Sequence, residues 1–405
     1  MAAGQSGVER VYLDWAATAP LCEEAAEAMR PFLEPGRANL AHGMNANSLH
    51  TPGRTAFSDL QAARARVARC IGARRPDEVT FTSGATEADN AALFGLVFAR
   101  VKAERQRGAK GYVPHVVTTA FEHEAVLQAV DVLRSLGCAV TLVAPDAQGF
   151  VDPEAVSAAR TADTAVVSVM AANNELGTIQ PVKELARAAH EAGALFHTDM
   201  VQLLGKAPVS MEEIGADAAS FSAHKVCGPK GVGALYLRAR TPFEPFIVGG
   251  GQEDGRRSGT QNVCGAVGFA AACEAACAAV QEEGARQRAL RDRLYAELTA
   301  RPNVRATIDV PAGSERHLPN IASVLVGGFE SETLILRLDM LGFCVSGGSA
   351  CSSTSLEPSH VLRAIGVSAD DALGSLRVSI GRYTTEADVD AFVKAFDQAL
   401  DWENR

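Results

Sequence analysis

Residues 78–87 read EVTFTSGATE, a short apolar run followed by small polar residues and the start of a helical pattern. The same strand-then-helix order recurs along the chain as far as residue 222. We expect strands at 78–82, 115–120, 140–144, 165–170, 195–198 and 219–222, and helices at 87–100, 124–136, 153–160 and 182–192. This alternation is typical of an α/β protein with a mostly parallel sheet that helices flank on both faces.

The order of elements changes in the last third of the chain. A long helical run at 265–299 breaks the alternation, and strands at 321–326 and 376–380 then mix with helices at 331–341 and 386–402. We predict two domains, a large one at 11–265 and a smaller α+β domain at 266–405. Residues 1–20 are expected to pack with the small domain.

The composition limits the classes of function. The chain has 405 residues and a formal net charge of −10 without a long run of Lys or Arg, which argues against nucleic acid or an anionic membrane as the main partner. The longest apolar stretch, 263–273, is too short to span a membrane, and the first ten residues lack the pattern of a secretory signal. We expect a soluble, cytoplasmic protein.

The nine cysteines, at positions 22, 70, 138, 227, 264, 273, 277, 344 and 351, are odd in number and scattered, which does not fit a disulfide framework. Cys273 and Cys277 are four residues apart on an expected helix and could share a face. No CxxC pair or nearby His has the spacing of a metal site, so we expect no metal. Most of the thiols are expected to be small core residues.

Two features point to a phosphate-bearing cofactor with an aldehyde. The small residues 83–86 lie between a strand and a helix, where backbone amides and the helix dipole can hold a phosphate, although such residues also cap ordinary helices. Neither a Walker loop nor a GxGxxG motif is present. Asp199 and Lys225 end neighbouring expected strands, where ligands of open α/β sheets bind. A lysine amine and a carboxylate beside a pyridine nitrogen are the groups that pyridoxal phosphate needs.

Three other residues are candidates for chemistry. His123 lies at a strand-to-helix junction, where it either caps the helix or serves the cofactor. Arg377 lies on an apolar strand and needs an anion, either a substrate carboxylate or a buried acidic side chain. Cys351 lies in the small, polar stretch 346–355, which is either an exposed loop that presents the thiol to a substrate or a linker that happens to contain it.

Together these residues resemble the NifS/IscS-type cysteine desulfurases, which are fold-type I pyridoxal-phosphate enzymes. The matching segments follow the family order over about residues 11 to 385: 11–14 with 16–18, 82–87, 122–123, 173–177, 197–199, 222–225 with 228–231, 249–253, 257–260, 349–351 and 356–359.

The resemblance assigns a role to each matching residue. Lys225 resembles the lysine that binds the cofactor covalently, Asp199 the partner of its ring nitrogen, and His123 the histidine that stacks on its ring. Arg377 resembles the residue that holds the substrate carboxylate, and Cys351 the thiol that accepts sulfur as a persulfide. The other expected cofactor contacts are Asn174 and Gln202, at the ring substituents, and Ala85, Thr86, Ser222, His224 and Thr260, at the phosphate.

The implied reaction converts L-cysteine to L-alanine and leaves sulfur on Cys351 for delivery to an acceptor, such as an iron–sulfur scaffold or a tRNA-thiolation enzyme. Because the family's residue at Thr260 serves the other subunit, the resemblance also implies a homodimer with shared active sites. Met200 follows Asp199 where the family usually has a small residue, and we expect it to narrow the pocket.

Three alternatives stay open at this point. A selenocysteine lyase would use the same residues on selenium. A fold-type I aminotransferase would have no need for Cys351. An assembly protein that binds the cofactor without activity would be the third, although every expected catalytic position is present.

Overall fold

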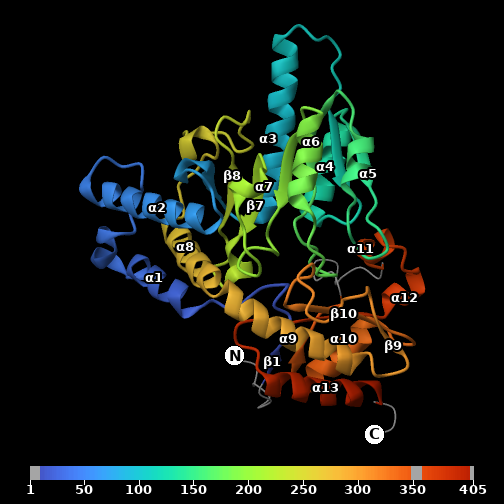
Figure 1. Ribbon diagram of the computed structural model, residues 1–405. Helices are drawn as coiled ribbons and strands as arrows, with labels where there is room; N and C mark the ends of the chain where they lie inside the picture. Colours follow the sequence, from blue (N-terminus) through green and yellow to red (C-terminus); the bar gives the residue numbers. More distant parts are fainter. Residues whose placement is uncertain (1–9, 348–357, 402–405) are drawn as a thin grey trace.

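The computed structural model describes residues 10–347 and 358–401, and its largest unit is a seven-stranded sheet (Figure 1). The strand order is β2-β8-β7-β6-β5-β3-β4. All neighbouring pairs are parallel except those that involve β8, which is antiparallel to both β2 and β7. The strands are β2 (Val79–Thr82), β3 (His115–Thr119), β4 (Ala139–Val143), β5 (Thr164–Ser168), β6 (Leu195–Asp199), β7 (Ala218–Ser222) and β8 (Gly233–Leu237).

Helices flank this sheet on both faces because its central strands are apolar on both sides. Val116 and Val166 belong to one hydrophobic core, and their neighbours Val117 and Val167 belong to another on the opposite face. The helices of this part are α1 (Glu23–Leu33), α2 (Thr51–Cys70), α3 (Ala85–Gln106), α4 (Glu124–Ser135), α5 (Pro153–Ala159), α6 (Val182–Glu191), α7 (Met211–Ile214) and α8 (Val263–Ala278). The predicted α/β class with a mostly parallel sheet is confirmed.

A second, antiparallel sheet has the strand order β12-β10-β9 and its own hydrophobic core. Its strands are β9 (Val304–Ala306), β10 (Ile321–Val326) and β12 (Ser375–Ser379), and its helices are α9 (Val280–Leu298), α10 (Ser331–Met340) and α13 (Glu386–Leu400). The short helices α11 (His360–Ala364) and α12 (Ala369–Leu373) contribute their apolar residues to the main core. The N-terminal strand β1 (Val11–Tyr12) pairs in parallel with β11 (Phe343–Cys344), and Leu13 joins the same core. The domain boundaries that we expected stay a prediction.

The structure divides the expected helical run 265–299 into two helices. Helix α8 packs along α1 and α2, whereas α9 packs against β10 and α13. The two helices meet at an angle of 70°, and among the described residues only this bent pair, taken together, reaches the length and apolarity of a membrane span. No single helix of the described ranges does so.

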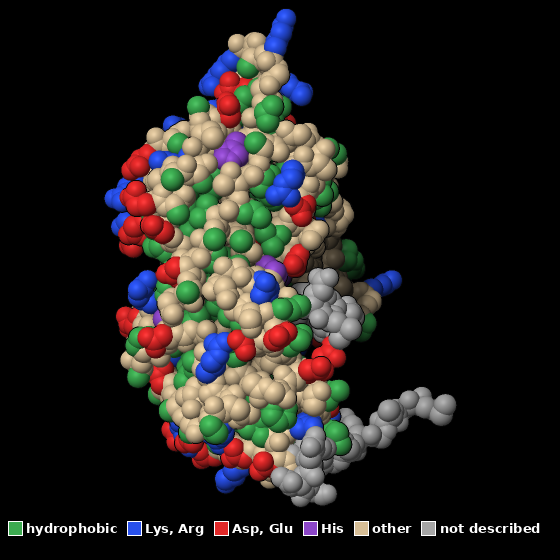
Figure 2. Space-filling model, turned by 90° about the vertical axis from the view of Figure 1, so that its right-hand side faces the viewer, with side chains coloured by type: hydrophobic (Ala, Val, Ile, Leu, Met, Phe, Trp, Pro, Cys, Tyr) green, Lys and Arg blue, Asp and Glu red, His purple; other side chains and the backbone are tan. Residues whose placement is uncertain are grey.

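On the face shown in Figure 2, acidic and basic side chains are interspersed.

Candidate active site

A cavity of about 440 Å³ opens at the carboxyl ends of the strands of the large sheet. Its walls come from the first turn of α3, the start of α4, the ends of β6 and β7, and β12 of the second sheet. Among the residues that line it are ten of the predicted site residues: Ala85, Thr86, His123, Asn174, Asp199, Gln202, Ser222, His224, Lys225 and Arg377. The topology therefore brings together side chains from positions 85 to 377.

Two predicted residues are not in this group. Thr260 is exposed on the segment between the turn Glu253–Gly255 and α8, and it does not line the cavity of this chain. Cys351 lies outside the described residues. The described residues on either side of that segment both reach the cavity region. Ser346 pairs through its backbone with Arg377, and the Ser359 hydroxyl donates to Glu175 over 2.6 Å.

One end of the cavity is suited to a small anion. Helix α3 begins at Ala85, after Gly84 in extended conformation, and the amides of a first helical turn have no acceptor within the helix. Strand β8 passes directly below this turn, where a Cβ on Gly233 would lie 2.7 Å from the carbonyl carbon of Gly84. A glycine is therefore required at position 233. The Ser222 and His224 side chains line the same end.

His224 is neutral in the folded protein. Its Nδ1 lies 3.1 Å from the Thr18 hydroxyl, and burial, together with the charge of Lys225, lowers its pKa to about 4. A neutral imidazole carries one N–H, which can donate to an anion when the other nitrogen is held by a hydroxyl. The strand-to-turn connection at 222–225 thus supplies a donor in addition to the amides of α3.

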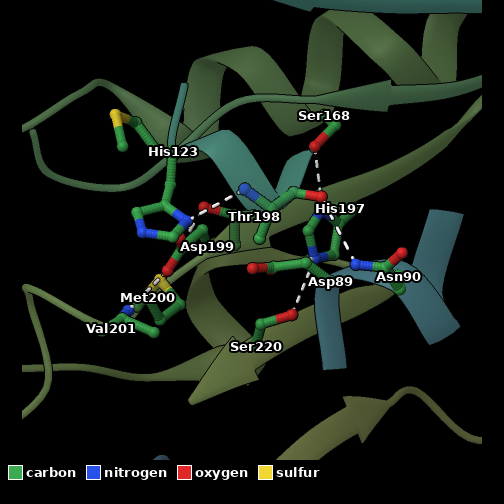
Figure 3. Close-up of polar contacts among 12 residues, drawn as sticks. Asp89, Asn90, His123, Ser168, His197, Thr198, Asp199, Met200, Val201 and Ser220 are labelled. Atoms are coloured by element: carbon green, nitrogen blue, oxygen red, sulfur yellow. Dashed lines mark hydrogen bonds and ion pairs between the residues drawn. The ribbon is translucent and has the colours of Figure 1, made fainter. Parts of the chain in front are cut away.

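Asp199 and His123 face each other across the middle of the cavity (Figure 3). Asp199 is the last residue of β6, and its Oδ1 accepts a hydrogen bond of 2.9 Å from the Val201 amide. Burial raises the pKa of Asp199, whereas His123, this amide and Lys225 act in the opposite direction. A carboxylate that is desolvated but surrounded by donors and cations is a good partner for a protonated ring nitrogen.

His123 also caps α4, because its Nδ1 accepts from the Ala125 amide over 3.1 Å. The two interpretations of this histidine, as a helix cap and as a cavity residue, are therefore both realised in the structure. Capping fixes the ring orientation and leaves Nε2 as the nitrogen directed away from the helix start.

Lys225 follows β7 in the short turn Ala223–Val226. Its Nζ donates to the carbonyl oxygens of Ala16 and Ala17, at 2.6 and 2.8 Å. The next positions complete a tight turn in which Cys227 has a φ of +64°, a left-handed conformation that few non-glycine residues adopt. The amine is thus held at the cavity by the N-terminal segment, a contact that the sequence did not predict.

Arg377 has an anionic partner within the protein. Its Nη2 donates to Asp14 over 2.9 Å and its Nη1 to the carbonyl oxygen of Asn174 over 2.8 Å. The buried ion pair that we considered for this residue is present, yet Nε has no partner among the described residues. Because Arg377 also lines the cavity, it retains one donor for a ligand.

A second set of buried titratable side chains lies at the cavity, and the sequence did not predict its place in the site; Asp89, one of its members, lines the cavity (Figure 3). His197 on β6 is hydrogen-bonded to Ser168 and Ser220 at 2.8 and 3.0 Å, and its Nε2 lies 3.6 Å from Asp89. Burial lowers the pKa of His197 to about 3 and raises that of Asp89 well above its ordinary value. Both shifts favour the neutral forms of the two groups, which weakens the ionic attraction between them.

Glu122 belongs to the same buried set. Its Oε1 accepts from the Thr119 hydroxyl and the Met170 amide, at 2.6 and 2.9 Å, and burial, reinforced by the charge of Asp199, raises its pKa to about 8. Segment 122–123 matches a family motif, but nothing in the sequence indicates that the Glu122 carboxyl is buried.

The polar atoms that remain without partners test whether a cofactor fits. Within the described ranges, the buried atoms Gln202 Oε1, Glu122 Oε2 and Arg377 Nε make no hydrogen bond, and all three residues line the cavity. Buried polar atoms are normally paired, so these atoms indicate a bound polar molecule. Pyridoxal phosphate fits, because it has a phosphate for the α3 end, a ring nitrogen for Asp199 and a hydroxyl for Gln202.

The expected effect of Met200 is not found. Its side chain is fully buried in the main hydrophobic core and does not line the cavity, whereas the following residue, Val201, does. The Met200 side chain, which is larger than the small residue usual in the family, packs into the hydrophobic core instead of the cavity. It therefore gives no reason to expect a narrower pocket.

Comparison with known proteins identifies the family. Residues 11–392 match the family model described as Aminotransferase class-V. A cysteine desulfurase IscS from Dictyoglomus turgidum is 42% identical over 393 residues, which cover 96% of this chain and 94% of the relative. A solved structure of a NifS-like protein has a TM-score of 0.86 at 37% identity and covers 97% of this chain and 100% of its own. The structure described as SspA in complex with cysteine has a TM-score of 0.76 at 30% identity, over 92% and 99%.

The chain therefore belongs to the class-V aminotransferase family. Within this family it is similar to the NifS/IscS type over nearly its whole length, which confirms the resemblance predicted from the motifs. The fold-type I architecture predicted with it is likewise confirmed.

Proposed function

We propose that the protein is a pyridoxal-phosphate-dependent cysteine desulfurase. It converts L-cysteine and the Cys351 thiol into L-alanine and a Cys351 persulfide. The observation that carries this proposal is the meeting of Lys225, Asp199, His123 and Arg377 in one cavity, although they come from four separate parts of the chain. The cysteine-bound SspA structure and the cysteine desulfurase relative support the choice of substrate.

The protein's own residues divide the work in this cavity. Ala85, Thr86, Ser222 and His224 bind the cofactor phosphate, Asn174 and Gln202 the ring substituents, and Asp199 the ring nitrogen. When bound, pyridoxal phosphate withdraws electrons from the substrate and weakens its bonds at Cα. Lys225 would hold the cofactor through its amine, and the same amine could carry the proton at the substrate Cα, since Nζ lies at the cavity, where it donates to two carbonyl oxygens.

Arg377 positions the substrate. Its unpartnered Nε and its place in the cavity wall suit a carboxylate, and the existing bond to Asp14 fixes the plane of the guanidinium. Asn174, whose carbonyl accepts from the same guanidinium, adds a side-chain amide to the substrate end.

Cys351 takes up the sulfur. Its thiolate attacks the substrate sulfur, an S–S bond forms as the Cβ–S bond breaks, and the carbon fragment leaves as L-alanine after gaining protons. No external oxidant or reductant is needed, because the electron pair of the broken Cβ–S bond stays on the carbon, whose reduction to the methyl group of alanine balances the oxidation of the sulfur. The described residues next to the Cys351 segment, Ser346 and Ser359, are bonded to the cavity residues Arg377 and Glu175, which supports this role.

Three further features belong to the same proposal. The protein forms a homodimer in which Thr260 completes the phosphate site of the partner, since this residue is exposed and does not line its own cavity. The persulfide is delivered to an acceptor protein for iron–sulfur cluster assembly or tRNA thiolation. The expected location is the cytoplasm.

The deciding experiment measures L-alanine formed from L-cysteine by the cofactor-loaded protein. We expect alanine from the wild type and from Cys344→Ser, a control thiol on β11, and almost none from Cys351→Ser. Equal alanine from all three would contradict the role of Cys351. Activity confined to L-selenocysteine would replace the proposed function with that of a selenocysteine lyase.

A further inference from the structure

Three cysteines from two helices meet at one point outside the cavity, and we name them the cysteine triad. Cys70 is the last residue of α2, and Cys273 and Cys277 are one turn apart on α8. Their sulfur atoms all lie within 4.8 Å of one another. None of the three residues lines the active-site cavity.

The triad is a consequence of how α2 packs along α8. These two helices form one of the main contacts of the fold, and Cys70 reaches the turn that carries Cys273 and Cys277. No metal site was predicted from the sequence, because the chain has no CxxC pair and no His near Cys273 and Cys277. The third sulfur comes from about two hundred residues earlier in the chain, which no local motif reveals.

The geometry suits a single ion better than a covalent pair. Sulfur atoms bound at about 2.3 Å to one zinc ion lie roughly 3.8 Å apart, a separation that the observed arrangement allows. A disulfide would engage two of the sulfurs and leave the third unused. Three sulfur donors without a carboxylate or imidazole favour soft cations, such as Zn²⁺ and Cu⁺, and disfavour Mg²⁺ and Ca²⁺.

The surroundings allow an ion to enter. Cys273 is buried, whereas Cys70 and Cys277 are half-buried, so the site lies just below the surface. Arg66 and Arg69, on the same helix as Cys70, pair with Glu274 on α8 at 2.7 and 3.2 Å. The Glu274 carboxylate is the member of this cluster whose charge acts on Cys70, so the positive charge that a thiolate site needs would come from the bound cation itself.

We infer that the cysteine triad binds one thiophilic d¹⁰ cation, Zn²⁺ or Cu⁺, through three thiolates and thereby links α2 to α8. Each thiol that becomes a ligand releases its proton, and no electron transfer is involved. A solvent molecule can fill a fourth position on zinc, whereas Cu⁺ needs none. This site is independent of the proposed desulfurase activity.

The test uses the full-length holoenzyme, reduced and freed of metal under anaerobic conditions. Zn²⁺ and Cu⁺ are titrated separately in competition with a chromophoric chelator for each ion. The variants are Cys70→Ser and Cys277→Ser, which change half-buried thiols, and the matched control is Cys264→Ser, a half-buried thiol on α8 outside the triad. Thermal unfolding with and without metal reports whether each variant is folded and whether the ion stabilises it.

We expect the wild type and Cys264→Ser to bind one more equivalent of Zn²⁺ or Cu⁺ than the triad variants, whose affinity falls at least about 100-fold. X-ray absorption on the bound metal should find three sulfur neighbours, at about 2.3 Å for zinc. Failure of both ions to bind the wild type, equal binding by Cys70→Ser, or a shell of nitrogen and oxygen would each overturn the inference. Alanine formation, measured separately, leaves the two proposals distinguishable.

Discussion

Two buried aspartates near the same cavity differ in what surrounds them. Asp199 has an amide donor at 2.9 Å and is stabilised in its charged form by His123 and Lys225. Asp89 has no such cations, lies 3.6 Å from a neutral histidine and experiences the charge of Asp199. Burial raises the pKa of both carboxyl groups. A hydrogen bond with Ser220 opposes this shift at Asp89, but only at Asp199 do cations oppose it as well.

His123 and Lys225 therefore favour a negative charge on Asp199, where the ring nitrogen of a ligand could pair with it. Asp199, Asp89 and Glu122 all line the cavity, and burial shifts all three carboxyl groups towards their neutral forms, but only at Asp199 do the charges of His123 and Lys225 oppose this shift. A single negative charge below the cofactor ring is well defined only when the neighbouring carboxyl groups are protonated.

Asp199→Asn should have the largest effect. The amide keeps an oxygen for the Val201 N–H but removes the charge, so alanine formation should fall on the order of 10²- to 10⁴-fold. Thermal unfolding should change little, since the side chain keeps its size and one hydrogen bond. Rates measured with saturating cofactor separate this loss from weaker cofactor binding, and a loss below tenfold would contradict the assignment of the charge to Asp199.

Arg377→Gln should raise KM for L-cysteine by about 10- to 100-fold, because one charge-assisted contact to a carboxylate is lost. It should also lower the free energy of unfolding by about 1–3 kcal/mol, since Asp14 loses its buried partner. The matched control is Arg382→Gln, which breaks an exposed pair with Glu24 and should cost less than about 1 kcal/mol. Equal effects from both variants would show that Arg377 has no special place in the site.

Much of the large sheet and of the cofactor end of the site could be predicted because its signals are local. Asp199 and Lys225 each follow an apolar run, and the pairing of β6 with β7 brings the ends of these runs together. The phosphate turn is also contained in one short segment, 83–86. In such cases a strand, a turn and a functional residue lie within about ten positions of each other.

The rest of the site depends on contacts between distant segments. Strand β8 was not expected, and its antiparallel position between β2 and β7 follows from the strand order and not from its own residues. The partner of Arg377, Asp14, is 363 positions away in the chain. The bend between α8 and α9 occurs at Ala279, without a proline or glycine, because the two helices pack on different cores.

The pH dependence of the free energy of unfolding tests whether Glu122 is protonated in the folded protein. The native state keeps its proton up to about pH 8, whereas the unfolded chain releases it near the ordinary value of 4.5. Raising the pH through this window favours the unfolded chain, by up to about 1.4 kcal/mol per pH unit. Urea unfolding at several pH values should therefore show a steeper loss of stability in the wild type than in Glu122→Gln.

The control for this measurement is Glu124→Gln, which changes a partly exposed carboxylate two residues away and should leave the wild-type pH dependence in place. Parallel curves for the wild type and Glu122→Gln would mean that Glu122 titrates alike in both states. The Glu122 carboxyl would then be ionised in the folded protein, and burial would not keep it neutral.

Asp89→Asn should have the smallest effect on alanine formation. It is therefore the matched control for Asp199→Asn. If Asp89 is protonated in the folded protein, the amide replaces one neutral group with another of the same shape, so alanine formation should change less than about threefold and stability by less than about 1 kcal/mol. The rate should also keep its pH dependence. A large loss with Asp89→Asn, comparable to that of Asp199→Asn, would place a second negative charge at the cavity. In that case the two aspartates would share their proton and would have to be treated as one titrating pair.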